Sequence, residues 1–341
     1  EEVPDDCTAV GIPARIVRRN GRRISDELDQ VHMPDPVAQE LCRMLDVSRT
    51  AIWKVMNQLK DEGYVIDAVK NKGYKLIQTP DIVTAEEVDS LLETEWAGHP
   101  VVYEEEQEST NQTAKMLAEQ GASHGTLVVA ERQVSGRGRR GRPWHSPKGS
   151  GIWMSILLRP QIHPMSASML TLVAAMAVYD AISSRVEGCA IKWPNDIVID
   201  GRKVCGILTE MSSELDNIHY VVIGIGINVN TDDFPEDIAA VAASMHVITG
   251  EYYKRAEIIA DVWKSFEKYY DQFLQTENLS LMVESYNQRL VNMGRKVYIE
   301  ERGSQYEGTA CGIDSEGALL VEKTDGTRTA VISGEVSVRG V

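Results

Sequence analysis

The sequence predicts an α+β protein in three parts: an N-terminal winged helix-turn-helix, a central mixed sheet with helices, and a small C-terminal β-barrel. Residues 49–62 have the periodicity of an amphipathic helix. The middle of the chain mixes strand-like apolar runs, some joined as hairpins, with a few helices, which favours a mixed or antiparallel sheet over a doubly wound one. From Arg295 onward, short apolar segments separated by glycines indicate a small barrel.

The first part centres on the helix expected over 49–62. Ser48 is a good N-cap, and Gly63 lies where a helix would end. A shorter helix over about 37–45 precedes it, so the two form a helix-turn-helix whose second helix faces a DNA groove. One face of the second helix is apolar: Ile52, Val55, Met56 and Leu59. We expect DNA contacts from Arg49, Thr50, Lys54 and Asn57.

A hairpin is expected after this helix. Residues 64–67 and 74–77 can pair around Lys70-Asn71-Lys72-Gly73, which makes a basic wing suited to phosphates. The alternative to a DNA-binding helix-turn-helix is that the two helices form a helical hairpin with no role at DNA. The domain is assigned to residues 37–80 only in part, because no regular helix is expected ahead of the pair. Whether the pair binds DNA without that helix stays open, and so does the operator sequence.

The central part is expected to span residues 82–290, after a linker that contains Pro80, and the barrel to span residues 291–341. The strands of the central part are expected at 126–131, 152–158, 190–193, 196–200, 203–210 and 220–230. Its helices are expected at 112–120, 167–186, 254–275 and 279–290. Asn111 is the expected N-cap of the first helix.

Composition narrows the class of protein and its partners. The chain has 341 residues and a net charge of −16, so DNA contact requires a local basic patch. No apolar run approaches the length of a membrane span, and we expect no membrane partner. The 5 cysteines are scattered without a Cys-x-x-Cys pair, which argues against zinc or disulfides and predicts a cytoplasmic location.

The most informative stretch is the glycine- and arginine-rich loop, residues 136–144. Its glycines let the backbone approach a ligand, and its arginines suit phosphate and carboxylate. The spacing Gly-x-Gly-x-x-Gly also occurs in dinucleotide-binding folds, where a helix opens at the glycines. Pro143 and Pro147 argue against such a helix, so we reject that interpretation. A solvated basic loop is the remaining alternative.

Further motifs accompany this loop. They are Ser109-Thr110-Asn111, Lys192-Trp193-Pro194-Asn195-Asp196, Arg202-Lys203-Val204-Cys205-Gly206 and Gly224-Ile225-Gly226-Ile227-Asn228. In this order and spacing the motifs resemble those of the biotin protein ligases. Residues 82–341 resemble that family's catalytic and C-terminal domains, and residues 45–80 the DNA-binding domain of its bifunctional repressor-ligases. The resemblance implies a sheet related to class II aminoacyl-tRNA synthetases and a barrel of the Src-homology-3 type.

The resemblance implies an ATP-dependent ligase. Such an enzyme activates biotin as biotinyl-5′-adenylate, releases pyrophosphate, and transfers biotin to a lysine of a biotin carboxyl carrier protein. Because the biotin carboxylate and the triphosphate repel each other, the site needs dense, preorganised positive charge. ATP and Mg²⁺ are the expected cofactors.

The resemblance also implies the roles of individual residues. Biotin is expected to contact Ser109, Thr110, Asn111, Gln133, Gly136, Arg137, Arg139 and Lys203. ATP is expected to contact Arg139, Arg140, Arg142, Trp144, Lys192, Asn195 and Asn228. Arg139 and Lys203 are the expected catalytic residues, at the biotin carboxylate and the α-phosphate. Asp196 either helps to bind Mg²⁺ or orients the acceptor lysine, and residues 231–246 form the loop on the adenosine side.

Other functions stay open. A DNA-binding biotin sensor without significant ligase activity would use the same site, and lipoate or octanoate ligases belong to the same superfamily. Repression can also coexist with ligation, because in the bifunctional family the adenylate favours a homodimer that binds operator DNA. We therefore expect a homodimer here, at least when the adenylate is bound.

Residues 1–44 differ from the rest of the chain. The stretch 7–17 and its continuation to about residue 44 resemble the C-terminal tail of serine acetyltransferases, where a left-handed β-helix ends in a polar tail. Without the rest of a transferase, this segment contains no acetyltransferase site. Its residues leave open whether it is native or a fusion.

Overall fold

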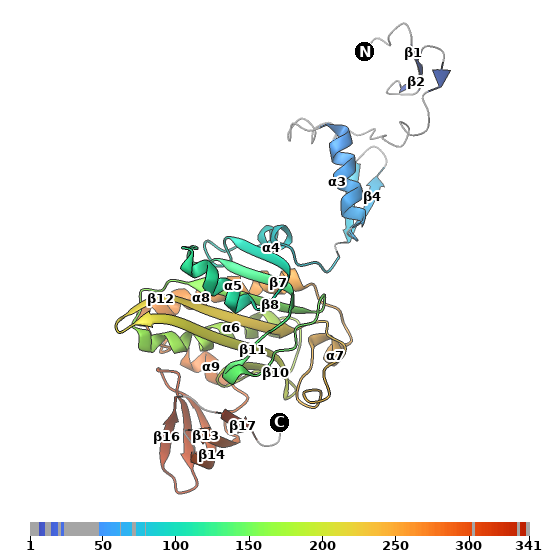
Figure 1. Ribbon diagram of the computed structural model, residues 1–341. Helices are drawn as coiled ribbons and strands as arrows, with labels where there is room; N and C mark the ends of the chain where they lie inside the picture. The colour runs from blue at the N-terminus through green and yellow to red at the C-terminus, as the bar shows by residue number, and fades with distance from the viewer. Residues whose placement is uncertain are drawn as a thin grey trace. The chain divides into compact units, whose positions relative to one another are not determined.

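The structure is a computed structural model that describes residues 7–10, 15–19, 22–23, 48–61, 63–69, 73–78, 80–301, 304–332 and 335–338. The chain divides into two compact units, Glu1–Pro80 and Asp81–Val341 (Figure 1). The shorter helix expected over 37–45 and residues 70–72 of the expected wing lie outside the described residues.

The first unit contains the predicted second helix and the predicted hairpin. Helix α3 (Arg49–Asp61) begins where Ser48 Oγ accepts a hydrogen bond from the Ala51 N–H at 3.1 Å, which confirms the N-cap. Strands β4 (Val65–Val69) and β5 (Gly73–Gln78) pair antiparallel. The expected β-hairpin is therefore confirmed.

The predicted apolar face of α3 is less buried than expected. Val55 is 54% exposed, whereas the other apolar residues of that face are half-buried. Three short strands form a separate antiparallel sheet earlier in the chain: β1 (Cys7–Val10), β2 (Arg15–Arg19) and β3 (Arg22–Arg23).

The second unit is built on a seven-stranded sheet in the order β6-β7-β8-β12-β11-β10-β9. Its strands are β6 (Val101–Gln107), β7 (Leu127–Gln133), β8 (Gly151–Leu158), β9 (Cys189–Lys192), β10 (Asp196–Ile199), β11 (Arg202–Glu214) and β12 (Asn217–Asn228). Strands β6 and β7 are parallel and the other neighbours antiparallel, which confirms the predicted mixed sheet. The prediction lacks β6, because exposed Glu104, Glu105 and Glu106 interrupt its apolar pattern.

Helices cover both faces of this sheet (Figure 1). Helix α5 (Thr110–Glu119) packs against β7, β8 and β12, on the face that contains Val128. Val129 points the opposite way, into the core shared with helices α6 (Leu170–Ser183) and α8 (Arg255–Thr276). The remaining helical segments are α4 (Ala85–Leu91), η1 (Arg139–Gly141), η2 (Pro164–Met169), α7 (Met245–Thr249) and α9 (Val283–Arg289).

Helix α5 begins two residues earlier than predicted, which changes the position of Asn111. Ser109 occupies the N-cap position, and Asn111 lies buried inside the first turn. The prediction that Asn111 caps the helix is therefore wrong. Its amide donates hydrogen bonds to strand β11 instead.

The predicted absence of a membrane-length apolar run needs correction. Segment Pro164–Ser183, which joins η2 to α6, is long and apolar enough to cross a membrane by length and composition. This window is 67% buried inside the protein. A helix that is apolar on all sides is expected in a protein core, and α6 packs there between the sheet and α8.

The C-terminal part is a five-stranded antiparallel sheet in the order β16-β15-β14-β13-β17. Its strands are β13 (Lys296–Glu301), β14 (Ser304–Ile313), β15 (Leu319–Lys323), β16 (Arg328–Val331) and β17 (Glu335–Val338). The expectation that this part consists of strands is confirmed. This sheet is joined to the central part where Trp193 Nε1 donates to the Gly317 carbonyl at 3.0 Å.

Candidate active site

A cavity of about 630 Å³ opens on the central sheet, lined by β11, β12 and the glycine- and arginine-rich loop. It brings together every predicted ligand-binding residue except Gly136: Ser109, Thr110, Asn111, Gln133, Arg137, Arg139, Arg140, Arg142, Trp144, Lys192, Asn195, Asp196, Lys203 and Asn228. Val336 of β17 also lines the cavity, so the C-terminal sheet contributes to its wall.

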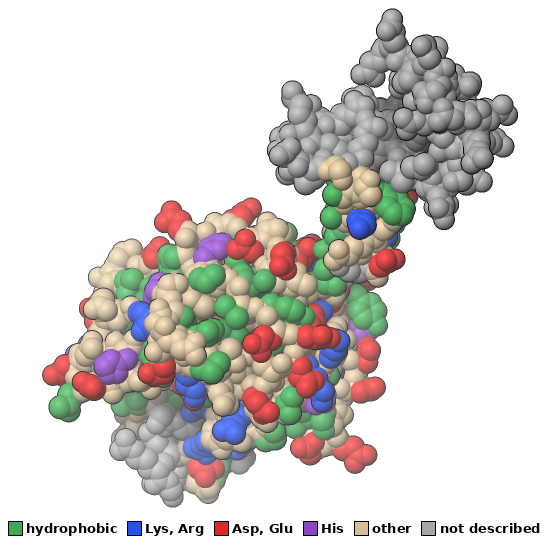
Figure 2. Space-filling model, turned by 45° about the horizontal axis from the view of Figure 1, so that its top comes forward, with side chains coloured by type: hydrophobic (Ala, Val, Ile, Leu, Met, Phe, Trp, Pro, Cys, Tyr) green, Lys and Arg blue, Asp and Glu red, His purple; other side chains and the backbone are tan. Residues whose placement is uncertain are grey.

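The cavity is positively charged although the chain is acidic. Figure 2 shows acidic side chains spread over the face it displays, in keeping with the net charge of −16. Two carboxylates line the cavity, Asp196 and Asp237. Six lining side chains carry positive charge: Arg137, Arg139, Arg140, Arg142, Lys192 and Lys203. This local excess favours anionic ligands such as carboxylates and phosphates.

One corner of the cavity is a hydrogen-bonded pocket. Gln133 Oε1 accepts the Thr110 N–H at 2.9 Å, and Gln133 Nε2 donates to Ser146 Oγ at 2.9 Å. Gly136 is required here because a Cβ would lie 2.7 Å from Ser146 Oγ and 3.0 Å from Gln133 Nε2. Gly136 therefore supports the pocket from behind rather than lining it.

The glycine- and arginine-rich loop folds back on itself rather than opening an α-helix. The Gly138 N–H donates to the Arg142 carbonyl at 2.8 Å and closes a short turn. This geometry agrees with the rejection of a dinucleotide fingerprint. Arg139 Nη1 donates to Asn195 Oδ1 at 3.0 Å, and Asn195 Nδ2 donates to the Ile207 carbonyl at 3.1 Å. Asn195 therefore links the loop to β11.

Trp144 lies on glycines of the sheet. Gly206 of β11 and Gly226 of β12 are paired across the two strands, and a Cβ on Gly226 would overlap Trp144 Nε1. A Cβ on Gly206 would lie 2.8 Å from the indole ring. Lys203 Nζ lies 5.2 Å from the ring centroid, within range of a cation–π interaction. The indole thus forms an apolar wall beside a cation.

Lys203 is held by its side chain and its backbone. Its Nζ lies 2.7 Å from Asp196 Oδ1. Its N–H donates to the Val241 carbonyl at 2.8 Å, and its carbonyl accepts the Ala243 N–H at 2.9 Å. Asn228 Nδ2 donates to the Ala243 carbonyl at 3.1 Å. The loop after β12 is therefore attached to the strand that carries Lys203.

Trp193 was not among the predicted site residues. Its side chain is 2% exposed, and its backbone N–H donates to Asn292 Oδ1 at 3.0 Å. Together with the hydrogen bond from the indole to Gly317, this contact fixes the motif of residues 192–196 on the side away from the cavity, while Lys192 and Asp196 line the cavity. The signal available for this division was the large apolar Trp193 between polar residues of the motif, Lys192 before it and Asn195 and Asp196 after it.

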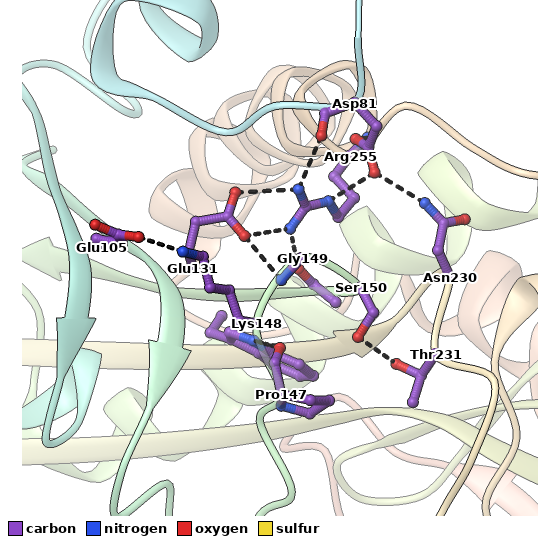
Figure 3. A network of polar contacts seen from close by, with 12 residues as sticks. Asp81, Glu105, Glu131, Pro147, Lys148, Gly149, Ser150, Asn230, Thr231 and Arg255 are labelled. Atoms are coloured by element: carbon purple, nitrogen blue, oxygen red, sulfur yellow. Dashed lines mark hydrogen bonds and ion pairs between the residues drawn. The ribbon is translucent and has the colours of Figure 1, made fainter. Parts of the chain in front are cut away.

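A buried ion network supports the strands of the site (Figure 3). Arg255, the first residue of α8, is 1% exposed and bonds Glu131 through Nη1 at 2.9 Å and Nη2 at 3.0 Å. Its Nε donates to Asp81 Oδ2 at 2.8 Å, and the remaining N–H groups reach the carbonyls of Asp81 and Gly151. Burial alone would lower the pKa of Arg255, but bonds and charges from Glu131 and Asp81 raise it above its ordinary value.

The network reaches both ends of the segment that carries the arginine loop. Glu131 lies on β7, two residues before Gln133, and its carboxylate also accepts the Gly149 N–H at 3.0 Å. Gly151, whose carbonyl bonds Arg255, starts β8. The sequence did not predict this ion network, because its residues lie far apart along the chain.

Comparison with known proteins identifies the family. Residues 103–228 match the Biotin/lipoate A/B protein ligase family, residues 34–75 an HTH domain, and residues 293–339 the Biotin protein ligase C terminal domain. The chain is 42% identical to the bifunctional ligase/repressor BirA of Bacillus spizizenii over 295 residues. The aligned region covers 85% of this chain and 90% of that protein. The chain belongs to the biotin protein ligase family.

More distant members of this family are also similar over most of the chain. The bifunctional ligase/repressor BirA of Escherichia coli is 30% identical over 306 residues, covering 88% of this chain and 92% of that protein. The structure of a biotin protein ligase from Aquifex aeolicus in complex with biotin and ATP is 30% identical, with a TM-score of 0.61. It covers 70% of this chain and 98% of the Aquifex chain.

Proposed function

We propose that this chain is an ATP-dependent ligase that joins biotin to a lysine of a biotin carboxyl carrier protein through biotinyl-5′-adenylate. The observation that carries the proposal is the cavity, where a hydrogen-bonded pocket and six cationic side chains meet on one sheet. The Aquifex aeolicus relative was solved with biotin and ATP, and the Bacillus and Escherichia relatives are named ligase/repressors.

Biotin has a ureido head with two N–H donors and one carbonyl, and a carboxylate at the end of a flexible chain. Ser109, Thr110 and Gln133 surround the head. Trp144, which the resemblance assigned to ATP, packs in this proposal against the apolar part of biotin instead. The carboxylate then extends toward Arg137, on the loop. The phosphates of ATP occupy the side of the cavity lined by Arg139, Arg140, Arg142, Lys192, Asn195 and Asn228.

The chemistry needs charge neutralisation rather than a protein nucleophile. A carboxylate oxygen of biotin attacks the α-phosphorus of ATP, and the bond to the bridging oxygen breaks to release pyrophosphate. Arg139 and Lys203 stabilise the negative charge on the carboxylate and the α-phosphate as the two anions approach. The acceptor amine then attacks the acyl carbon, AMP leaves, and the amine loses a proton.

Mg²⁺ fits this site as a companion of ATP. Mg²⁺ commonly uses one or two protein carboxylates and completes its shell with phosphate oxygens and water. Asp196 and Asp237 line the cavity and would provide such ligands, while Asp196 also faces Lys203. Within the described stretches of the chain, no group of three or more His, Cys, Asp or Glu side chains converges to hold a metal alone.

The first unit supports a second activity, repression of transcription by binding to operator DNA. Residues 34–75 match an HTH domain, and on α3 the side chains of Thr50 and Lys54 are exposed, with Asn57 half-buried. A homodimer that forms when the adenylate is bound would present two such helices to a symmetric site. Arg49 is placed on the same helix by its backbone.

The finer features of the fold are part of the same proposal. The mixed sheet flanked by helices is compatible with a core related to class II aminoacyl-tRNA synthetases, and the five-stranded sheet with a barrel of the Src-homology-3 type. The free thiols of half-buried Cys189 and buried Cys205 fit a reducing cytoplasm.

The test is biotin- and ATP-dependent release of pyrophosphate, with purified carrier domain present. We expect release with biotin and none with lipoate or octanoate. Lys203→Ala should lower the rate roughly a hundredfold or more, because a charge at the reacting oxygens is lost. Lys268→Ala, which removes an exposed lysine outside the cavity, should leave the rate unchanged.

Other outcomes would redirect the assignment. Release with lipoate or octanoate, but not biotin, would move the chain to the sister ligases. If none of the three acids causes release of pyrophosphate but biotin still binds, the chain would be a DNA-binding biotin sensor without ligase activity.

A further inference from the structure

Asn111 has an unusually constrained amide next to the hydrogen-bonded pocket. Its Nδ2 donates to Glu210 Oε2 at 2.7 Å and to the Leu208 carbonyl at 3.4 Å. Ser155 Oγ lies 2.6 Å from Asn111 Oδ1. A Cβ on Gly224 would overlap Asn111 Oδ1, so the amide lies directly against the backbone of β12. The amide is therefore held by β11, β12 and Ser155 at the edge of the cavity.

The partners of Asn111 fix which way its amide points. A carboxylate and a carbonyl only accept hydrogen bonds, so the amide NH₂ must face Glu210 and Leu208. The oxygen must then face Ser155. Because that oxygen has no proton, the Ser155 hydroxyl is the donor to Asn111.

This assignment determines what Thr110 presents to the cavity. Ser155 Oγ also lies 2.7 Å from Thr110 Oγ1, but the single Ser155 proton is already used. The Thr110 proton must go to Ser155 Oγ or to Gln133 Oε1, which is 3.1 Å away, since both are acceptors there. In either case Thr110 Oγ1 offers the cavity a lone pair and no proton.

Glu210 itself is not part of the cavity lining; its carboxylate bonds the Asn111 amide and also interacts through charge with Arg137 of the cavity. Lys115 Nζ lies 2.8 Å from the other Glu210 oxygen and holds that carboxylate in place. Burial alone would raise the pKa of Glu210, but hydrogen bonds from Lys115 and Asn111 and the charge of Lys115 lower it below its ordinary value. The carboxylate is ionised at neutral pH and can only accept.

We propose that Glu210 is a positioning residue that orients the chain Asn111–Ser155–Thr110, so that the pocket accepts an N–H donor from its ligand. This inference rests on the proposed biotin ligase function and adds a basis for selectivity. The ureido head of biotin supplies such a donor, whereas the dithiolane of lipoate and the methyl end of octanoate do not. A ligand without the donor leaves the Thr110 lone pair unpaired, which is costly in a buried site.

The test is Glu210→Gln, measured by calorimetry for biotin binding and by pyrophosphate release for catalysis. Glutamine has the same shape but can present either an oxygen or an NH₂ to Asn111. Only the longer bond to the Leu208 carbonyl, at 3.4 Å, then favours the original direction of the chain, which is enforced less strongly. We expect the Kd for biotin to rise about tenfold or more, as for loss of a charge-assisted hydrogen bond. The rate at saturating biotin and the KM for ATP should be unchanged. Desthiobiotin, which keeps the ureido group, should lose the same affinity.

Two further variants make the test specific. Glu214→Gln removes an exposed carboxylate from the same strand and should leave the Kd unchanged. Ser155→Ala breaks the same chain at its centre, so its effect should not add to that of Glu210→Gln in the double variant.

Opposite results separate the two proposals. Wild-type affinity in Glu210→Gln, or strictly additive effects in the double variant, would overturn the positioning role while leaving the ligase intact. Failure of the wild-type protein to bind biotin or release pyrophosphate with it would instead overturn the proposed function.

Discussion

At the scale of single residues, the site depends on small residues that leave room for its side chains and on neutral residues that position its charges. Gly206 and Gly226 are required because the Trp144 indole lies where their side chains would be. Arg139 reaches its place through a hydrogen bond to Asn195, which in turn is tied to β11. The positive charge of the site therefore depends on neutral neighbours that hold it.

A substitution at Gly226 tests this packing. In Gly226→Ala the new methyl group overlaps Trp144, so the indole must move and carry part of the loop with it. We expect weaker biotin binding and a shifted tryptophan fluorescence spectrum, with a cost of ~1–3 kcal/mol in stability from overpacking. Trp144→Leu in the same protein should restore part of the lost stability. An unshifted spectrum with wild-type affinity would contradict the packing argument.

At the scale of elements, the site is a junction of segments that meet only in the folded protein. Strand β7 carries Gln133, β11 carries Lys203, and β12 ends at Asn228. The Arg255 network joins the start of α8 to β7 and β8, with Asp81 at the beginning of the second unit. The elements are thus coupled through charge as well as through the sheet.

Removal of the central cation should destabilise this junction. Arg255→Met leaves the carboxylates of Asp81 and Glu131 without their cation in a region that is largely buried, and we expect a loss of about 3–5 kcal/mol. Urea unfolding of the full chain measures it. Arg328→Met breaks an exposed pair with Glu322 and should cost less than about 1 kcal/mol. Equal small losses in both variants would show that the network is unimportant for stability.

At the scale of the whole molecule, the chain separates DNA contact from chemistry. The HTH match and α3 lie in the unit Glu1–Pro80, whereas the cavity is lined entirely by residues of Asp81–Val341. The acidic second unit repels DNA, so the basic residues of α3 must supply the attraction locally.

Charge reversal on α3 should therefore separate the two activities. We expect Lys54→Glu to abolish enrichment of any sequence from a random DNA pool, in the presence of biotin and ATP, because it opposes the DNA phosphates. Pyrophosphate release by the same variant should equal that of the wild type. A matched Lys264→Glu change, on an exposed part of α8, should affect neither. Loss of both activities in Lys54→Glu would show that the units do not work independently.

Much of the fold and the site could be predicted because the signals are local. The amphipathic period of α3, its Ser48 cap and the glycine-separated C-terminal strands depend on residues close in sequence. The arginines around Arg139 indicate anion binding from residue type, and the family resemblance of the motifs implied the site residues, almost all of which line the cavity. Strand β6 was not predicted because three exposed glutamates follow its half-buried first three residues and interrupt the apolar pattern.

The sequence by itself determined the class of fold and the anionic character of the ligands, because charge and periodicity are properties of neighbouring residues in the chain. The expected roles of individual site residues came from the resemblance to a family, and the residues that line the cavity agree with them. Only the tertiary structure decided that Asn111 bonds Glu210 and Ser155 rather than capping α5. It also decided that Trp193 anchors its motif to the C-terminal sheet. The physical reason is that a buried polar group takes whichever partners the packed elements bring to it, and those partners lie far away in sequence.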